Sequence, residues 1–127
     1  MKNQSDILVV DDNPTMAQTL ADILHAKGYQ VHTAFCGEEA LQVLENEAID
    51  IMLTDVRMPD MSGVELYRRS RDIQPLMRTF LMTAYSADDV IQQGLNEGIK
   101  TVLTKPLDVN LLLTLIDAAV SVERYRS

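Results

Sequence analysis

The chain has 127 residues, 46% hydrophobic and 24% charged, which suits one domain with a core of its own. Its formal net charge of -8 argues against direct nucleic-acid binding, because affinity for phosphates needs Lys and Arg. The single Cys36 excludes an internal disulfide, and no apolar run approaches the roughly 18–20 residues of a membrane span. Because the N-terminal MKNQSD also lacks the apolar region of a secretion signal, we expect a cytoplasmic protein that does not enter membranes.

Short apolar runs alternate along the chain with segments of helical periodicity. The first run, Ile7–Val10, is unbroken, which is typical of a strand buried on both faces. It stops at Asp11-Asp12, and Asn13-Pro14 then opens a helix with proline at a permitted early position. In chain order we predict strand 7–10, a helix from 14 to about 27, strand 31–35, a helix opening at 37, strand 50–54, helix 64–73, strand 79–83, a helix from 86 to about 96, strand 101–103 and a helix from 108 to about 123.

This alternation predicts a parallel sheet with helices on both faces, because right-handed crossovers return each strand in the same direction. We therefore expect an α/β fold, a flavodoxin-like doubly wound five-stranded parallel sheet in the order 2-1-3-4-5 with five helices. Residues 1–127 would form a single domain whose core is about 5–123.

Polar side chains stand where four of the predicted strands end, at the edge where ligands bind in open α/β sheets. Carboxylates brought together repel one another, so they raise a pKa or require a cation. Since the pattern contains neither His nor Cys, hard oxygen ligands favour Mg²⁺ over zinc. These strand-end residues are Asp11, Asp12, Asp55, Thr83 and Lys105.

Such a site suits phosphoryl transfer, in which Asp55 attacks phosphorus, Thr83 donates a hydrogen bond, and the metal and Lys105 offset negative charge. Each residue alone could equally be a cap, a strand-end hydroxyl or a solvated charge. Their joint placement at four strand ends favours a functional site.

Four separated motifs resemble those of the receiver domain of two-component response regulators. They are VVDDN at 9–13, LTDVRMPDMSG at 53–63, MTAYS at 82–86 and TKP at 104–106, and the resemblance covers residues 5–123. It implies that Asp55 accepts a phosphoryl group from a sensor histidine kinase or phosphotransfer protein, in a reaction that needs Mg²⁺. It implies a phosphoacceptor signalling domain that promotes only its own phosphorylation and dephosphorylation, not a metabolic enzyme.

The resemblance also assigns individual roles. Asp12 and Asp55 would hold Mg²⁺ together with the backbone carbonyl of Arg57, and Asp11 would act mainly through water. Thr83 and Lys105 would contact the phosphoryl group. The Lys105-Pro106 bond is similar to one that receivers hold in cis, which costs an X–Pro bond only about 0.5–1 kcal/mol.

The chain departs from the family pattern at the residues that transmit and tune the signal. Many receivers carry a Tyr or Phe three positions before the site lysine, and here that residue is Val102, whose short stiff side chain cannot make the usual rotation. Arg57 and Tyr85 stand two positions after Asp55 and Thr83, where the family tunes access of water to the phosphoryl group. We expect these two large side chains to slow self-dephosphorylation.

The last predicted helix carries two apolar stripes. Leu112, Ile116 and Ala119 match a core face. The second stripe indicates either a deeply buried helix or an exposed surface for a partner or a homodimer. That surface would belong to the face formed by helix 86–96, strand 101–103 and helix 108–123. In receivers this face reports phosphorylation to an output domain or partner. The expected interface residues are Leu111, Leu115, Ala118 and Val122, with Ile91 beside them.

Other functions remain open at this stage. The protein could be a degenerate receiver that works without phosphate, as an interaction or dimerisation module. A phosphatase of the haloacid-dehalogenase type would carry a DxD pair after the first strand, and a flavin-binding electron carrier would carry a hydroxyl- and Gly-rich phosphate loop there. The chain has DDNPT at that place.

Overall fold

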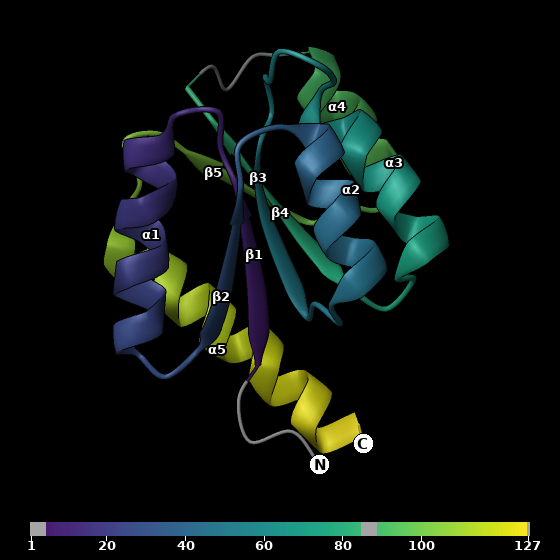
Figure 1. The fold of residues 1–127 in the computed structure, drawn as a ribbon. Helices are drawn as coiled ribbons and strands as arrows, with labels where there is room; N and C mark the ends of the chain where they lie inside the picture. The colour runs from purple at the N-terminus through teal and green to yellow at the C-terminus, as the bar shows by residue number, and fades with distance from the viewer. Residues whose placement is uncertain (1–4, 85–88, 127) are drawn as a thin grey trace.

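The fold is an alternating series of strands and helices, seen in a computed structural model that describes residues 5–84 and 89–126, with side chains to residue 121 (Figure 1). The elements are β1 (Asp6–Val10), α1 (Pro14–Ala26), β2 (Gln30–Ala34), α2 (Gly37–Asn46), β3 (Ile51–Asp55), α3 (Gly63–Ile73), β4 (Arg78–Thr83), α4 (Asp89–Asn96), β5 (Thr101–Thr104) and α5 (Val109–Arg126).

The strands form one parallel sheet in the order β2-β1-β3-β4-β5, which confirms the predicted fold class and strand order. The register aligns their carboxyl ends: Val10 is opposite Thr54, and Thr83 is opposite Thr104. As a result, Asp11, which follows β1, comes level with Asp55, the last residue of β3. Lys105, which follows β5, lies one position beyond Thr83, the last residue of β4. The predicted strand-end residues therefore share one edge of the sheet.

Helices cover both faces of the sheet. Helices α1 and α5 lie on one face, and α2, α3 and α4 lie on the other (Figure 1). Strand β1 contributes side chains to the core on both faces of the sheet. Ile7 and Val9 pack in the core against α1 and α5, while Leu8 and Val10 pack beneath α2 and α3. All four side chains are fully buried, as predicted from the absence of alternation in that strand.

Side-chain caps mark the starts of two helices. Asn13 precedes α1, and its side chain accepts a hydrogen bond from the backbone N–H of Met16 at 3.1 Å, with Pro14 following as predicted. Ser62 caps α3 in the same way, through Glu65. Helix α4 is described from Asp89, so its predicted start at residue 86 lies outside the described residues.

Helix α5 confirms its predicted core face, because Leu112 and Ile116 are fully buried and Ala119 is nearly so. In the second stripe, Leu111 is 47% exposed, while Leu115 is partly buried against the α1–α5 core. Ala118 is exposed, and the side chain of Val122 lies outside the described part.

The expectation that Ile91 lies beside this stripe is wrong. Ile91 is only 5% exposed and packs in a third cluster with Val56, Val64, Leu81 and Ile99, between α3, α4 and the sheet. Among the described residues, none of the helices combines the length and hydropathy needed to cross a bilayer.

Candidate functional site

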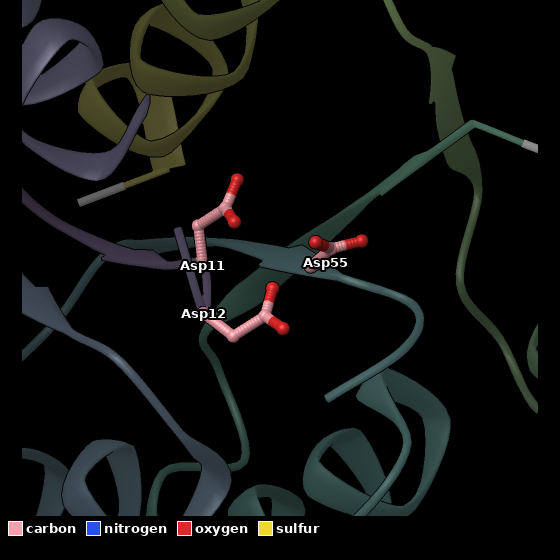
Figure 2. Close-up of side chains that lie close together, drawn as sticks. All are labelled: Asp11, Asp12 and Asp55. Atoms are coloured by element: carbon pink, nitrogen blue, oxygen red, sulfur yellow. The ribbon is translucent and has the colours of Figure 1, made fainter. Parts of the chain in front are cut away.

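Three carboxylates gather at the carboxyl ends of β1 and β3 (Figure 2). Asp11 is fully buried, Asp55 is 9% exposed and Asp12 is exposed. Each offers one carboxylate oxygen, and these oxygen atoms lie within 4.8 Å of one another. A set of three carboxylate oxygens that is partly open to solvent matches the ligand preference of a hard divalent cation.

Lys105 reaches the same cluster from the loop after β5. Its Nζ atom lies 3.1 Å from Oδ2 of Asp11 and 3.1 Å from Oδ2 of Asp55. The backbone N–H of Lys105 donates to the carbonyl of Thr83 at 2.7 Å, which ties this loop to β4. The Lys105-Pro106 peptide bond is cis, as expected. The lysine therefore bridges the two buried carboxylates of the cluster.

The cluster perturbs the ionisation of its own members. Burial raises the pKa of the Asp55 carboxyl above its usual range; the Lys105 ammonium opposes this change, and the charges of Asp11 and Asp12 add to it. Partial burial acts against the charge on Lys105, yet its hydrogen bonds to Asp11 and Asp55 raise its pKa above the usual value. The lysine is thus held as a cation, while Asp55 carries a charge that the fold disfavours.

The remaining predicted site residues differ in burial and in how much of them the structure describes. Thr83 is 3% exposed at the end of β4. Arg57 is exposed on the loop after β3, and Val102 is partly buried against the cluster that contains Ile91. Tyr85 lies outside the described residues.

The loop between β3 and α3 turns back tightly beside Asp55. The backbone N–H of Val56 donates to the carbonyl of Met82 at 3.0 Å, and that of Gly63 donates to the carbonyl of Val56 at 2.8 Å. Arg57 and Ser62 form an antiparallel bridge across the loop. A Cβ atom on Gly63 would overlap the backbone carbonyl of Asp55, so a glycine is needed where the chain passes the acidic residue.

One residue of this loop has a structural role that the sequence reasoning missed. The two carboxylate oxygens of Asp60 accept hydrogen bonds from the backbone N–H groups of Gly37 and Glu38, at 3.0 and 2.9 Å, at the start of α2. The motif PDMSG marks Asp60 as a turn residue, and no local signal connects it to a helix that begins 23 positions earlier.

The comparisons with known proteins agree with this geometry. Residues 7–117 match the family model described as response regulator receiver domain. A response regulator receiver protein of Anaeromyxobacter sp. (strain Fw109-5) is 42% identical over 108 residues, which are 85% of this chain and 45% of that relative. The chain thus spans less than half of that relative's length.

Solved structures of receivers have the same fold. A CheY-like response regulator receiver domain protein from Methanospirillum hungatei JF-1 superposes with a TM-score of 0.92 and 29% identity, covering 98% of this chain and 100% of that one. A response regulator from Burkholderia pseudomallei, with a phosphorylated aspartic acid, a calcium ion and citrate, superposes with a TM-score of 0.82 and 30% identity. The match covers 98% of this chain and 74% of that one.

Receiver domains are signalling phosphoacceptor modules that pair with histidine kinases, and a cluster of three aspartates is typical of their metal site. The family match extends over nearly the whole chain, and the sheet order and the acidic cluster agree with it. The chain belongs to the response regulator receiver domain family.

Proposed function

We propose that this chain is a phosphorylation-dependent switch in which Asp55 accepts a phosphoryl group from a sensor histidine kinase or phosphotransfer protein, in a reaction that requires Mg²⁺. The observation that carries the proposal is the position of Lys105, whose Nζ atom lies 3.1 Å from a carboxylate oxygen of Asp55 and the same distance from one of Asp11. A cation held beside a partly buried carboxylate can offset charge on a group transferred to that carboxylate.

The residues present suit Mg²⁺. Asp12 and Asp55 would hold the ion with the backbone carbonyl of Arg57, and Asp11 would act mainly through water. Bound there, the ion would neutralise charge on the phosphoryl oxygens. Support comes from the Burkholderia pseudomallei response regulator, which contains a phosphorylated aspartic acid and a calcium ion.

In the proposed reaction a carboxylate oxygen of Asp55 forms a bond to phosphorus while the bond between phosphorus and the donor's imidazole nitrogen breaks. The electron pair of that bond stays with the imidazole. Lys105 then exchanges its contact with the Asp55 carboxylate for one with a phosphoryl oxygen, and the Thr83 hydroxyl donates to another. Arg57 and Tyr85 would restrict the approach of water and so slow hydrolysis of the acyl phosphate.

The output of the switch would be the face formed by α4, β5 and α5, which would control an output domain or partner or form a homodimer. On that face Leu111 is 47% exposed and Ala118 is exposed, so apolar area is available to a partner. Val102 stands on β5 in place of the usual aromatic residue, so the signal would pass from Thr83 to this face through packing of short side chains rather than through rotation of a ring.

The test is the intact mass of the protein after incubation with acetyl phosphate, with Mg²⁺ or with a chelator. We expect one phosphoryl group per chain with Mg²⁺ and none with the chelator. Asp55→Asn should abolish the addition, whereas Asp22→Asn, which removes an exposed carboxylate on α1, should leave it unchanged. No addition to the wild type would contradict the proposal and favour a phosphate-independent receiver that associates through Leu111 and Ala118.

A further inference from the structure

The first turn of α2 is capped from a different part of the chain. Cys36 occupies the N-cap position, and within the described residues its side chain makes no capping hydrogen bond. The backbone N–H groups of Gly37 and Glu38 donate instead to the two carboxylate oxygens of Asp60, in the loop between β3 and α3. Slight burial tends to raise the pKa of the Asp60 carboxyl, but these hydrogen bonds outweigh it and lower the pKa below its usual value. The group is therefore ionised at neutral pH.

A second contact joins the same two segments. The side chain of Met61 lies so close to Gly37 that a Cβ atom on that glycine would overlap its Cγ and Sδ atoms. Met58, on the other side of Asp60, packs against the core cluster beneath α2 and α3. The middle of the loop is therefore fastened to α2 and to the core, while its two ends are held by the hydrogen bonds of Val56 and Gly63.

Loop 56–62 is also the segment that connects Asp55, the last residue of β3, to α3. It begins directly after Asp55, and Arg57, whose carbonyl is a proposed metal ligand, bridges to Ser62 across it. A backbone carbonyl has no side-chain torsions with which to adjust, so its position depends on how firmly its loop is held. Groups that orient metal ligands in this indirect way typically change metal affinity about 10–100-fold when they are removed.

We propose that Asp60 is a positioning residue for the metal site: by fastening loop 56–62 to the first turn of α2, it holds the main chain at Arg57 in place beside Asp55. This inference rests on the proposed Mg²⁺-dependent function. It assigns a role in metal binding to a residue whose carboxylate accepts hydrogen bonds from α2.

The simpler explanation is that Asp60 serves only the stability of α2, since loss of an N-cap typically costs about 1 kcal/mol. The two explanations can be separated because α2 can be capped from within. Cys36→Ser places a hydroxyl at the N-cap position, where the extended backbone (φ -158°, ψ 171°) is suited to a capping serine. The double variant Cys36→Ser/Asp60→Ala restores a cap to α2 but leaves the loop unfastened.

The experiment measures the Kd of Mg²⁺ by titration calorimetry on the full 127-residue chain, and stability by urea unfolding, for the wild type, Cys36→Ser, Asp60→Ala and the double variant. We expect Asp60→Ala to lose stability and to bind Mg²⁺ about tenfold more weakly. The double variant should regain stability but keep the weakened Kd.

Recovery of the wild-type Kd in the double variant would overturn the inference in favour of simple capping, and so would an unchanged Kd in Asp60→Ala. If Asp60→Ala does not fold, Asp60→Asn keeps one acceptor oxygen and should show an intermediate Kd; a wild-type value would again overturn the inference. Failure of the wild type to bind Mg²⁺ at all is a separate result, because it removes the proposed function itself.

Discussion

The charge on Asp55 should destabilise the metal-free protein, so we predict that Asp55→Asn makes the fold more stable at pH 7. Asparagine keeps the shape of the side chain and one acceptor oxygen while removing its charge. The raised pKa of Asp55, which follows first from burial and is increased by Asp11 and Asp12, already indicates that the fold disfavours the ionised form.

The magnitude follows from the charges around Asp55. Oxygen atoms of Asp11 and Asp12 lie within 4.8 Å of one on Asp55, and at an effective dielectric constant of about 20 each repulsion amounts to at least about 3.5 kcal/mol. On the same scale the attraction to Lys105 at 3.1 Å is about 5 kcal/mol. Water screens the charge of the exposed Asp12 and so weakens its repulsion, whereas burial of Asp55 adds to the cost of its charge. We therefore expect Asp55→Asn to raise the free energy of unfolding by about 1–2 kcal/mol.

The assay is urea unfolding in the presence of a chelator, with thermal unfolding as a second measurement. For a domain of this size, about 1 kcal/mol corresponds to roughly 4 °C in Tm. Because the pKa of Asp55 is raised in the folded state, the wild type loses stability as pH rises through that pKa, whereas the asparagine does not titrate. The advantage of the variant should therefore grow from about pH 3 to pH 7.

Mg²⁺ should make the wild type more stable than Asp55→Asn. At 100 times its Kd a bound ion adds about 2.7 kcal/mol to the wild type, and it should add less to a variant that lacks one carboxylate ligand. Asp22→Asn, which makes the same change of charge on an exposed site of α1, should alter stability by less than about 0.5 kcal/mol. A variant Asp55→Asn that is less stable than the wild type without metal would refute the reasoning, since the Lys105 pair would then outweigh burial and repulsion.

Two further substitutions test contacts at opposite ends of β3, Gly63 beside Asp55 and Gln74 at the segment before the strand. Gly63→Ala would place a methyl group against the backbone carbonyl of Asp55, so urea unfolding should show a loss of about 1–3 kcal/mol and titration calorimetry a weaker Kd for Mg²⁺. The matched control is Gly94→Ala, whose Cβ would meet only the ends of side chains at 3.0–3.3 Å. An equal loss of stability in both variants would contradict the view that the backbone contact causes the loss in Gly63→Ala. Gln74→Leu removes three hydrogen bonds to main-chain groups, including the buried N–H of Ile49 at 2.8 Å, and should cost about 1–3 kcal/mol in urea unfolding. An unchanged midpoint in that variant would mean that water satisfies these groups equally well.

Contacts between elements were beyond prediction from local patterns. The Arg68 guanidinium on α3 lies 2.6 Å from a carboxylate oxygen of Glu97 after α4, and Asp60 caps a helix that begins 23 residues earlier in the chain. The burial of Ile91 belongs to the same class, because the face of α4 that meets the sheet depends on the rotation of that helix against Val64 and Leu81. Helical spacing alone showed which residues share a face, but it could not show what that face contacts.

Local patterns in the amino-acid sequence were enough to predict the elements, their order and the strand-end site. Strands such as Ile7–Val10 are apolar runs whose ends are marked by adjacent acids, prolines and glycines. Parallel pairing brings the residue after each strand to one edge, so the strand order alone predicts that Asp11, Asp55 and Lys105 lie together, as they do. The packing of the folded chain established two further facts: Asp11 is buried while Asp12 is exposed, and Asp60 of loop 56–62 accepts hydrogen bonds from the first turn of α2. Burial and capping across the fold depend on distances between segments far apart in the chain, which no local pattern contains.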